Sequence, residues 1–200
     1  FINSYRIEAA KELLSSKRPT RTRKIPLKAA SYRGKIVSTK LHSEHIITYS
    51  YESRLERDRL YLVDHDIHCT FILPQPEIEW TDEKGNKRLY YPDNYLEYDD
   101  GKIIYEEVKP FQKLQKLLED SHWNNKMTKI QKSLQKQGAE LRIITELDIR
   151  IPRLNNICML REAAQHPPNF SQINEVKIIL PLVYNKTACY ILSNLVKRVN

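Results

Sequence analysis

Apolar and polar positions in the first half of the chain change from helical spacing to extended stretches broken by turn residues. The spacing predicts a helix over residues 4–15 and a second helix that is capped by Ser53 and ends at about Asp64. The apolar stretches that follow are separated by Pro and by Gly-containing turns, a pattern typical of strands with tight connections. We expect these strands at residues 67–73, 77–80, 87–98 and 102–109.

The second half returns to helical spacing with one further strand. Residues 113–137 carry apolar side chains at mostly helical positions, and Gly138 is a natural helix end. The apolar run 140–146 predicts a strand that returns after a helical crossover, which favours parallel pairing with the preceding strand. Beyond Ile151 the pattern predicts helices at roughly 152–165, 172–181 and 187–198.

These elements predict an α/β fold with a mixed sheet. The core order is helix, three antiparallel strands, helix and parallel strand, or αβββαβ. We expect three regions: an N-terminal helix and arm over 1–44, the α/β core over 45–150, and a small helical C-terminal region over 151–200.

The formal net charge of +8 is concentrated in the arm. Between Leu13 and Ser43 there are nine basic residues and no acid, so the rest of the chain sums to −1. Such a segment is typical of a solubilising tail, of a contact with an acidic protein or of phosphate binding in nucleic acids, and we favour the last. The predicted DNA-binding residues are Lys17, Arg18, Arg21, Arg23, Lys24, Lys28, Arg33, Lys35 and Lys40.

The cysteines and the hydropathy indicate the compartment. Cys69, Cys158 and Cys189 are scattered and odd in number, which predicts reduced thiols in a cytoplasmic protein. No apolar run approaches the length of a membrane-spanning helix, and residues 1–30 lack a signal-peptide core. We expect no membrane partner.

The candidate chemistry lies around the turn Asp99-Asp100-Gly101. A three-residue hairpin loop ending in Gly places Asp93 opposite Glu107, and alternation along the strand puts Glu107 and Lys109 on one face. A two-residue turn would instead place Asp93 opposite Val108 and on the wrong face. In the first register, two carboxylates and one ammonium converge, which suits a divalent cation and phosphodiester hydrolysis. An ordinary solvated hairpin is the alternative.

The element order and five short motifs resemble a known group of enzymes. The αβββαβ order with Asp93 and the Glu107-Val108-Lys109 triplet resembles the PD-(D/E)xK nuclease superfamily, which has a restriction-endonuclease-like core. Within it, about residues 45–150 are similar to the TnsA-like endonuclease subunit of heteromeric transposases. The motifs are Ser53-Arg54-Leu55-Glu56-Arg57-Asp58, Gln75-Pro76, Tyr91-Pro92-Asp93, Glu106-Glu107-Val108-Lys109-Pro110 and Thr145-Glu146.

The resemblance implies a role for each matching residue. Glu56, Asp93, Glu107 and Lys109 are the implied catalytic residues, although some relatives have Gln where this chain has Glu107. Asp93, Glu107 and the Val108 carbonyl would bind Mg²⁺, with Mn²⁺ as a substitute, and Glu56 would bind through water or help to hold a second ion. Three other acids are interpreted differently: Glu52 as a charge at the helix start, Glu106 as facing away, and Glu146 as lying near the edge of the site in a role left open.

The implied activity is Mg²⁺-dependent cleavage of the 5′ ends of a transposon during cut-and-paste transposition. The implied partners are the double-stranded DNA of the transposon ends, a DDE-type transposase that cuts the 3′ ends, and an AAA+ regulator. The smaller family members, which include those of CRISPR-associated transposons, have a short C-terminal region, as here. A stand-alone PD-(D/E)xK restriction or repair nuclease and a non-catalytic DNA-binding scaffold of the same fold are the alternatives.

Overall fold

The computed structural model describes residues 18–20, 32–40 and 46–165. The helices predicted over 4–15, 172–181 and 187–198 therefore lie outside the described residues. The chain divides into two compact units, Phe1–Leu154 and Asn155–Asn200. Of the second unit, only residues 155–165 are described, and they contain the rest of a helix that begins at Pro152.

Strands and helices follow the predicted order in the described part of the chain. The strands are β1 (Gly34–Val37), β2 (Thr48–Tyr51), β3 (Cys69–Pro74), β4 (Ile78–Thr81), β5 (Lys87–Tyr90), β6 (Asn94–Tyr98), β7 (Ile103–Val108) and β8 (Ala139–Ile144). The helices are α2 (Arg54–Asp64), α3 (Phe111–Leu118), α4 (Ser121–Gln135), α5 (Glu146–Ile149) and α6 (Pro152–Ala163).

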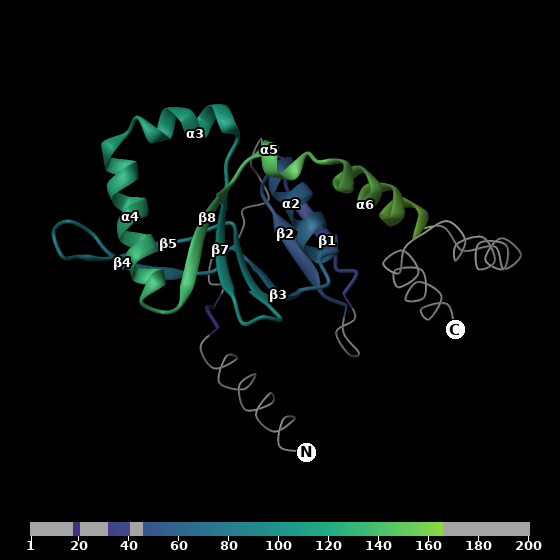
Figure 1. Ribbon diagram of the computed structural model, residues 1–200, viewed down its shortest axis with the longest axis horizontal. Helices are drawn as coiled ribbons and strands as arrows, with labels where there is room; N and C mark the ends of the chain where they lie inside the picture. The colour runs from purple at the N-terminus through teal and green to yellow at the C-terminus, as the bar shows by residue number, and fades with distance from the viewer. Residues whose placement is uncertain (1–17, 21–31, 41–45, 166–200) are drawn as a thin grey trace, which may run out of the picture. The chain divides into compact units, whose positions relative to one another are not determined.

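The central sheet is mixed, as predicted. It has four strands in the order β3-β6-β7-β8, with β3, β6 and β7 antiparallel and β8 parallel to β7 (Figure 1). The remaining strands form two-stranded ribbons, β1-β2 and β4-β5. The α/β fold with a mixed sheet is thus confirmed for the first unit.

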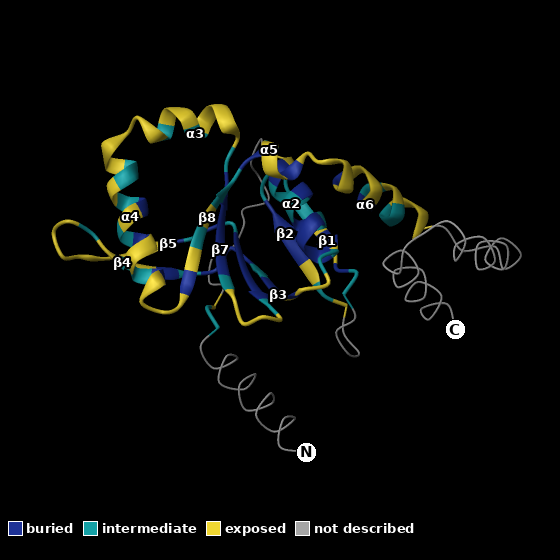
Figure 2. Cartoon of the chain, viewed as in Figure 1, coloured by how far each residue is buried: buried dark blue, intermediate teal, exposed yellow. Residues whose placement is uncertain are grey.

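Each face of this sheet covers its own apolar cluster. Leu96 and Ile104 pack with Leu60 and Val63 of α2 and with the β1-β2 ribbon. The alternate residues of the same strands, such as Tyr95, pack against α4 and the β4-β5 ribbon on the other face. Burial on both faces explains why β6 and β7 are almost continuously buried (Figure 2).

The strand predicted over 87–98 is wrong as a single element. It is two strands that belong to different sheets, β5 in the outer ribbon and β6 in the central sheet. Pro92 lies between them, and because Pro has no backbone N–H it cannot continue a hydrogen-bonded ladder. The chain changes direction at Pro92, and Asp93 lies directly before the start of β6.

The single helix predicted over 113–137 is also wrong. The structure has α3 and α4, and the break occurs at Asp120, whose side chain caps α4 by accepting from His122 N at 2.9 Å. Similarly, β8 ends at Ile144, two residues before the predicted end, because Thr145 caps α5 in a capping box with Asp148.

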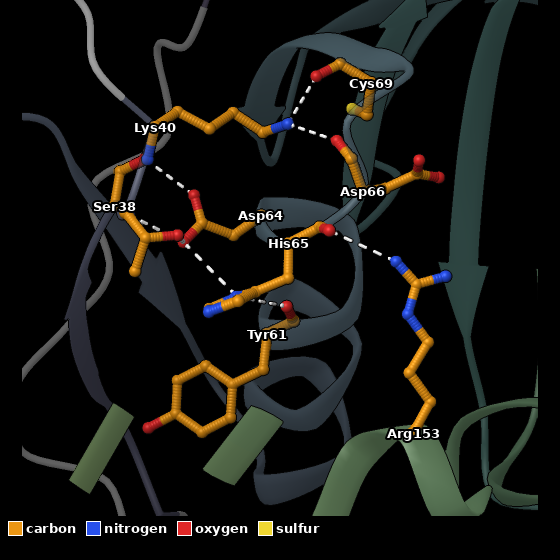
Figure 3. A network of polar contacts seen from close by, with 9 residues as sticks. Ser38, Lys40, Tyr61, Asp64, His65, Asp66, Cys69 and Arg153 are labelled. Atoms are coloured by element: carbon orange, nitrogen blue, oxygen red, sulfur yellow. Dashed lines mark hydrogen bonds and ion pairs between the residues drawn. The ribbon is translucent and has the colours of Figure 1, made fainter. Parts of the chain in front are cut away.

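The arm contains an element that the pattern did not predict. Strand β1 pairs with β2 in an antiparallel ribbon, and Ile36 and Tyr49 from this ribbon enter the core. Beyond β1, Ser38 Oγ donates to Asp64 Oδ1 at 2.6 Å, and Lys40 Nζ donates to the carbonyls of Asp66 and Cys69 (Figure 3). Part of the arm is therefore built into the fold.

The cysteines agree with the predicted reduced thiols as far as they are described. Cys69 is buried and Cys158 is half-buried, and both are free, while Cys189 lies outside the described residues. Burial raises the pKa of the Cys69 thiol to about 12. No helix in the described segments combines the length and apolar character that a membrane crossing requires.

An ion pair fastens α2 to the centre of the sheet. Arg59 donates through Nε to Glu106 Oε2 at 2.9 Å and through Nη2 to Glu106 Oε1 at 2.5 Å. The Glu106 side chain is only 1% exposed, so its charge depends on this guanidinium.

We expect Arg59→Met to lower the free energy of unfolding by about 3 to 5 kcal/mol, because it leaves a buried carboxylate without its partner. Urea denaturation measures this loss. Arg142→Met is the matched control, since Arg142 pairs with Glu140 and both side chains are about half exposed. That variant should lose about 1 kcal/mol or less, and equal losses in the two variants would contradict a structural role for the buried pair.

Candidate active site

The hairpin between β6 and β7 sets the geometry of the candidate site. Tyr98 N donates to Lys102 O and Gly101 N donates to Tyr98 O, each at 3.0 Å, and Gly101 has a φ of 84°. Asn94 pairs with Glu106, so the next residues outward, Asp93 and Glu107, face each other. The three-residue loop and its register are confirmed, and the two-residue turn is excluded.

Three of the predicted residues meet at the end of this hairpin. Asp93 Oδ2 accepts from Val108 N at 2.6 Å and lies 3.8 Å from Lys109 Nζ. Lys109 Nζ also contacts Glu107 Oε1 and donates to the Val108 carbonyl at 3.3 Å. The predicted convergence of two carboxylates and one ammonium is therefore present.

The folded environment shifts the pKa values of Asp93 and Lys109 in this cluster. Burial and the neighbouring Glu107 raise the pKa of Asp93 from 3.8 to about 8. Burial lowers the pKa of Lys109, but Asp93 and Glu107 outweigh that effect and the pKa ends above its ordinary value. Lys109 is consequently a stable cation, suited to charge stabilisation rather than to proton abstraction.

Glu56 lies within electrostatic reach of the cluster but has a second task. Its Oε2 accepts from Glu52 N at 2.7 Å, and its own N–H donates to Ser53 Oγ at 3.2 Å, so it completes the start of α2. Burial raises the pKa of Glu56, and the hydrogen bonds with the Glu52 N–H and with Ser53 oppose this rise; the charge of Glu52 raises the pKa and the charge of Lys109 lowers it. Its carboxylate thus both closes the helix end and adds negative charge near Lys109.

Tyr90 is a site residue that the sequence analysis missed. It is buried, and its hydroxyl donates to Glu107 Oε2, the carboxylate oxygen that does not contact Lys109. Burial and Glu107 both raise the pKa of Tyr90, which keeps the phenol protonated as a donor. Tyr90 therefore holds the orientation of Glu107. Its position two residues before Pro92 was the available signal.

Gln75 supports Asp93 from the end of β3. Its backbone is in the left-handed region, with a φ of 54°, and its N–H donates to the Asp93 carbonyl at 2.9 Å. A left-handed backbone is unfavourable for a residue with a side chain and is found where the surroundings enforce it, often at functional sites. Gln75 Nε2 donates to Glu52 Oε1 at 3.0 Å, so Glu52 contributes more than a charge at the helix start.

Two other acids make contacts outside the cluster. Glu106 points to the opposite face and binds Arg59, as predicted for its strand position. Glu146, whose role was open, accepts from Phe111 N at 2.7 Å and so joins the start of α3 to the start of α5.

The predicted DNA-binding residues divide into described and undescribed sets. Arg18 forms a two-point ion pair with Glu97, with N···O distances of 2.7 and 2.6 Å. Arg33 lies 3.4 Å from Glu52, Lys40 binds main-chain carbonyls, and Lys35 is exposed. Lys17, Arg21, Arg23, Lys24 and Lys28 lie outside the described residues. Internal contacts thus occupy Arg18, Arg33 and Lys40.

The donor set fits a hard divalent cation. Among the residues described, no three Asp, Glu, His or Cys side chains gather as a ready-made metal site. Mg²⁺ requires only one or two protein carboxylates and completes its shell with water. Asp93, Glu107 and the Val108 carbonyl supply such oxygens. Burial and then the charge of Glu107 raise the pKa of Asp93, and a bound cation would offset both effects.

Comparison with known proteins gives one family match. Residues 65–146 match the family described as TnsA-like endonuclease N terminal. The matched segment contains Asp93, Glu107, Val108, Lys109 and Glu146, and it begins after Glu56. No curated protein matches the chain.

The raised pKa of Asp93 predicts how stability changes with pH. In the folded state Asp93 keeps its proton up to about pH 8, whereas in the unfolded state it loses the proton near pH 3.8. The free energy of unfolding therefore falls as pH rises from about 3.8 towards about 8. We expect Asp93→Asn, which carries no charge, to raise the melting temperature of the protein without divalent cations. The gain over wild type should be larger at about pH 8 than at about pH 5.

Thermal unfolding in chelator-treated buffers measures this difference. Asp100→Asn is the control, because the pKa of this exposed carboxyl is lowered by Lys102 and the group is ionised at both pH values. A gain for Asp93→Asn that stays constant between the two pH values would contradict the electrostatic description of the site.

Proposed function

We propose that this chain, whose residues 65–146 match the TnsA-like endonuclease N-terminal family, is a Mg²⁺-dependent DNA endonuclease subunit of a transposase. It cleaves the 5′ ends of the transposon during cut-and-paste transposition. The family match supports a nuclease that acts on DNA with a transposase, and the cation, the strand and the cut-and-paste route are the proposal's own content.

The observation that carries the proposal is the convergence of Asp93, Glu107 and Lys109 at one end of the hairpin. Burying two carboxylates this close to each other costs free energy, and groups perturbed in this way cluster at functional sites. The match of residues 65–146 to an endonuclease family supports a catalytic function for these residues.

The residues of the chain divide the chemical work among them. Asp93 and Glu107 would hold the cation, and Val108 N–H orients one carboxylate while the Tyr90 hydroxyl orients the other. When bound, Mg²⁺ supplies a Lewis acid that polarises the scissile phosphate and lowers the pKa of a coordinated water.

Lys109 acts on the charge that develops during the reaction. Its ammonium, kept protonated by the adjacent carboxylates, donates to the non-bridging phosphate oxygens and orients the attacking water. In-line attack then releases a 3′-hydroxyl and a 5′-phosphate. Glu56 contributes from the start of α2, through water or at a second ion.

The partners follow from the family. A DDE-type transposase cuts the 3′ ends, so that joint action releases the element, and an AAA+ regulator controls the assembly. Target strand and position come from these partners, because charge on this chain cannot distinguish one sequence from another. The chain acts in the cytoplasm, on the nucleoid.

Reconstitution with the transposase on DNA that carries transposon ends tests the proposal. We expect nicks at the 5′ ends that require Mg²⁺, are retained with Mn²⁺, and fall by about 100-fold or more in Asp93→Ala. Strand-specific mapping of the nicks is the measurement. Asp100→Ala, in the exposed turn at the far end of the hairpin, is the control and should cut like wild type.

Other outcomes separate the alternatives. Strong cutting by the purified chain without any partner would favour a stand-alone restriction or repair nuclease. Binding to ends without cutting in any combination would favour a non-catalytic scaffold. Unchanged cutting by Asp93→Ala would contradict the proposed active site.

Tyr90→Phe tests the support of Glu107. Loss of the hydroxyl frees one Glu107 oxygen, so we expect the Mg²⁺ concentration for half-maximal cutting to rise by about 10-fold or more, while the fold is retained. A Mg²⁺ titration of the cutting rate measures it. Tyr91→Phe is the matched control, because that hydroxyl donates to Glu77. An identical Mg²⁺ dependence in both variants would contradict a positioning role.

A further inference from the structure

The helix pair after β7 carries a local excess of positive charge outside the arm. Residues 111–138 contain six lysines and two acids. Both acids, Glu119 and Asp120, lie at the junction between α3 and α4, so α4 itself has no acid. Lys126, Lys129, Lys132 and Lys136 recur every three or four residues, which places them along one side of this helix and its C-cap. We call these four residues the α4 lysine face.

The α4 lysine face is not neutralised by the fold. None of its four lysines forms an ion pair with any described residue, whereas Lys87 and Lys102 on nearby turns and strands pair with Glu79 and Asp100. Lys132 and Lys136 are exposed, and Lys126 and Lys129 are half-buried. Four cations on one helix without counter-charges raise the electrostatic energy of the free protein.

This face borders an open groove. The groove has a volume of about 610 Å³ and lies between α4 and the β4-β5 ribbon, with Lys129, Lys132 and Lys136 on one side and Glu77 to Thr81 on the other. The ribbon from Glu77 to Arg88 has four acids and three bases. Lys87 pairs with Glu79 and Arg88 pairs with Asp82, so the unbalanced charge along the groove is positive.

The face connects to the candidate active site. Lys126 Nζ lies 4.7 Å from the centre of the Tyr90 ring, and the Tyr90 hydroxyl donates to Glu107. Tyr105 of β7, which shares the sheet face of Glu107, lines the groove beside the C-terminal half of α4. In Figure 1, α4 lies alongside β4 and β5. The α4 lysine face therefore begins beside the candidate active site, at Lys126, and continues along the groove.

We propose that the α4 lysine face binds the phosphate backbone of the DNA substrate and guides it to Asp93 and Glu107. This inference rests on the proposed function and adds a substrate-binding surface that is separate from the arm. From Lys126 to Lys136 the helix advances about 15 Å, a length that matches roughly four phosphates of one DNA strand. The binding is independent of sequence, because ammonium groups contact phosphates and do not read bases.

Salt-dependent DNA binding by the full chain tests the proposal without cleavage. The parent protein carries Asp93→Asn, so that bound duplex stays intact, and the probe is a labelled duplex of arbitrary sequence. In this parent, Lys132→Gln/Lys136→Gln should weaken binding and make the slope of log affinity against log salt shallower by about 1.8, which is 0.9 for each lost phosphate contact. Fluorescence anisotropy from about 50 to about 200 mM salt measures both.

The control variant is Lys102→Gln/Arg142→Gln, which removes the same charge from exposed positions on the turn and on β8. It should keep the parent slope. An equal loss in the control, an unchanged slope in the α4 variant, or no measurable DNA binding by the parent would each overturn the proposal. Unchanged DNA binding would leave an acidic protein surface as the partner of these lysines.

The cutting assay separates this inference from the proposed function. If the α4 variant loses binding as expected but wild type never cuts with any partner, the DNA surface stands and the endonuclease role fails. If wild type cuts and the α4 variant binds normally, the endonuclease role stands and the surface fails.

Discussion

The register of the β6-β7 hairpin is the constraint on which the site depends. The left-handed Gly101 closes a three-residue loop, and counting outward from it brings Asp93 opposite Glu107 and puts Lys109 on the same face. Because side chains alternate along a strand, a shift of one residue would send the acid of the triplet to the α2 face and Glu106 to the site. One turn therefore decides which of two adjacent glutamates joins Asp93 and Lys109.

The buried carboxylates of this sheet differ in how fully their charge is balanced by neighbouring side chains. Glu106 receives two hydrogen bonds from Arg59, and Glu97 receives two from Arg18 and a third from the Tyr95 hydroxyl. At the hairpin end, Asp93 and Glu107 share the single ammonium of Lys109. The charge of the first two acids is balanced internally, whereas the last pair keeps an excess negative charge, which adds to burial in raising the pKa of Asp93. This imbalance is the feature on which the proposed cation site rests.

The change of chain direction at Pro92 and the left-handed backbone of Gln75 explain how one short segment contributes residues to two sheets. Pro92 ends the ribbon after Tyr90, and the chain re-enters the central sheet at Asn94, so Tyr90 and Asp93 approach Glu107 from different sheets. Gln75 fixes the Asp93 backbone from a third strand. The ammonium of Lys126 also lies over the Tyr90 ring, so Tyr90 contacts both the carboxylate cluster and a lysine of α4.

The sequence by itself determined the α/β class, the helix capped by Ser53, the hairpin turn and the grouping of Asp93, Glu107 and Lys109. These features follow from turn chemistry and from periods of two and 3.6, which act within a few residues. Only the tertiary structure decided that Arg18, Arg33 and Lys40 serve internal acids and carbonyls, that Tyr90 holds Glu107, and that Pro92 separates two sheets. Those contacts join elements far apart in the chain, and their partners depend on packing and side-chain reach, which local spacing does not encode.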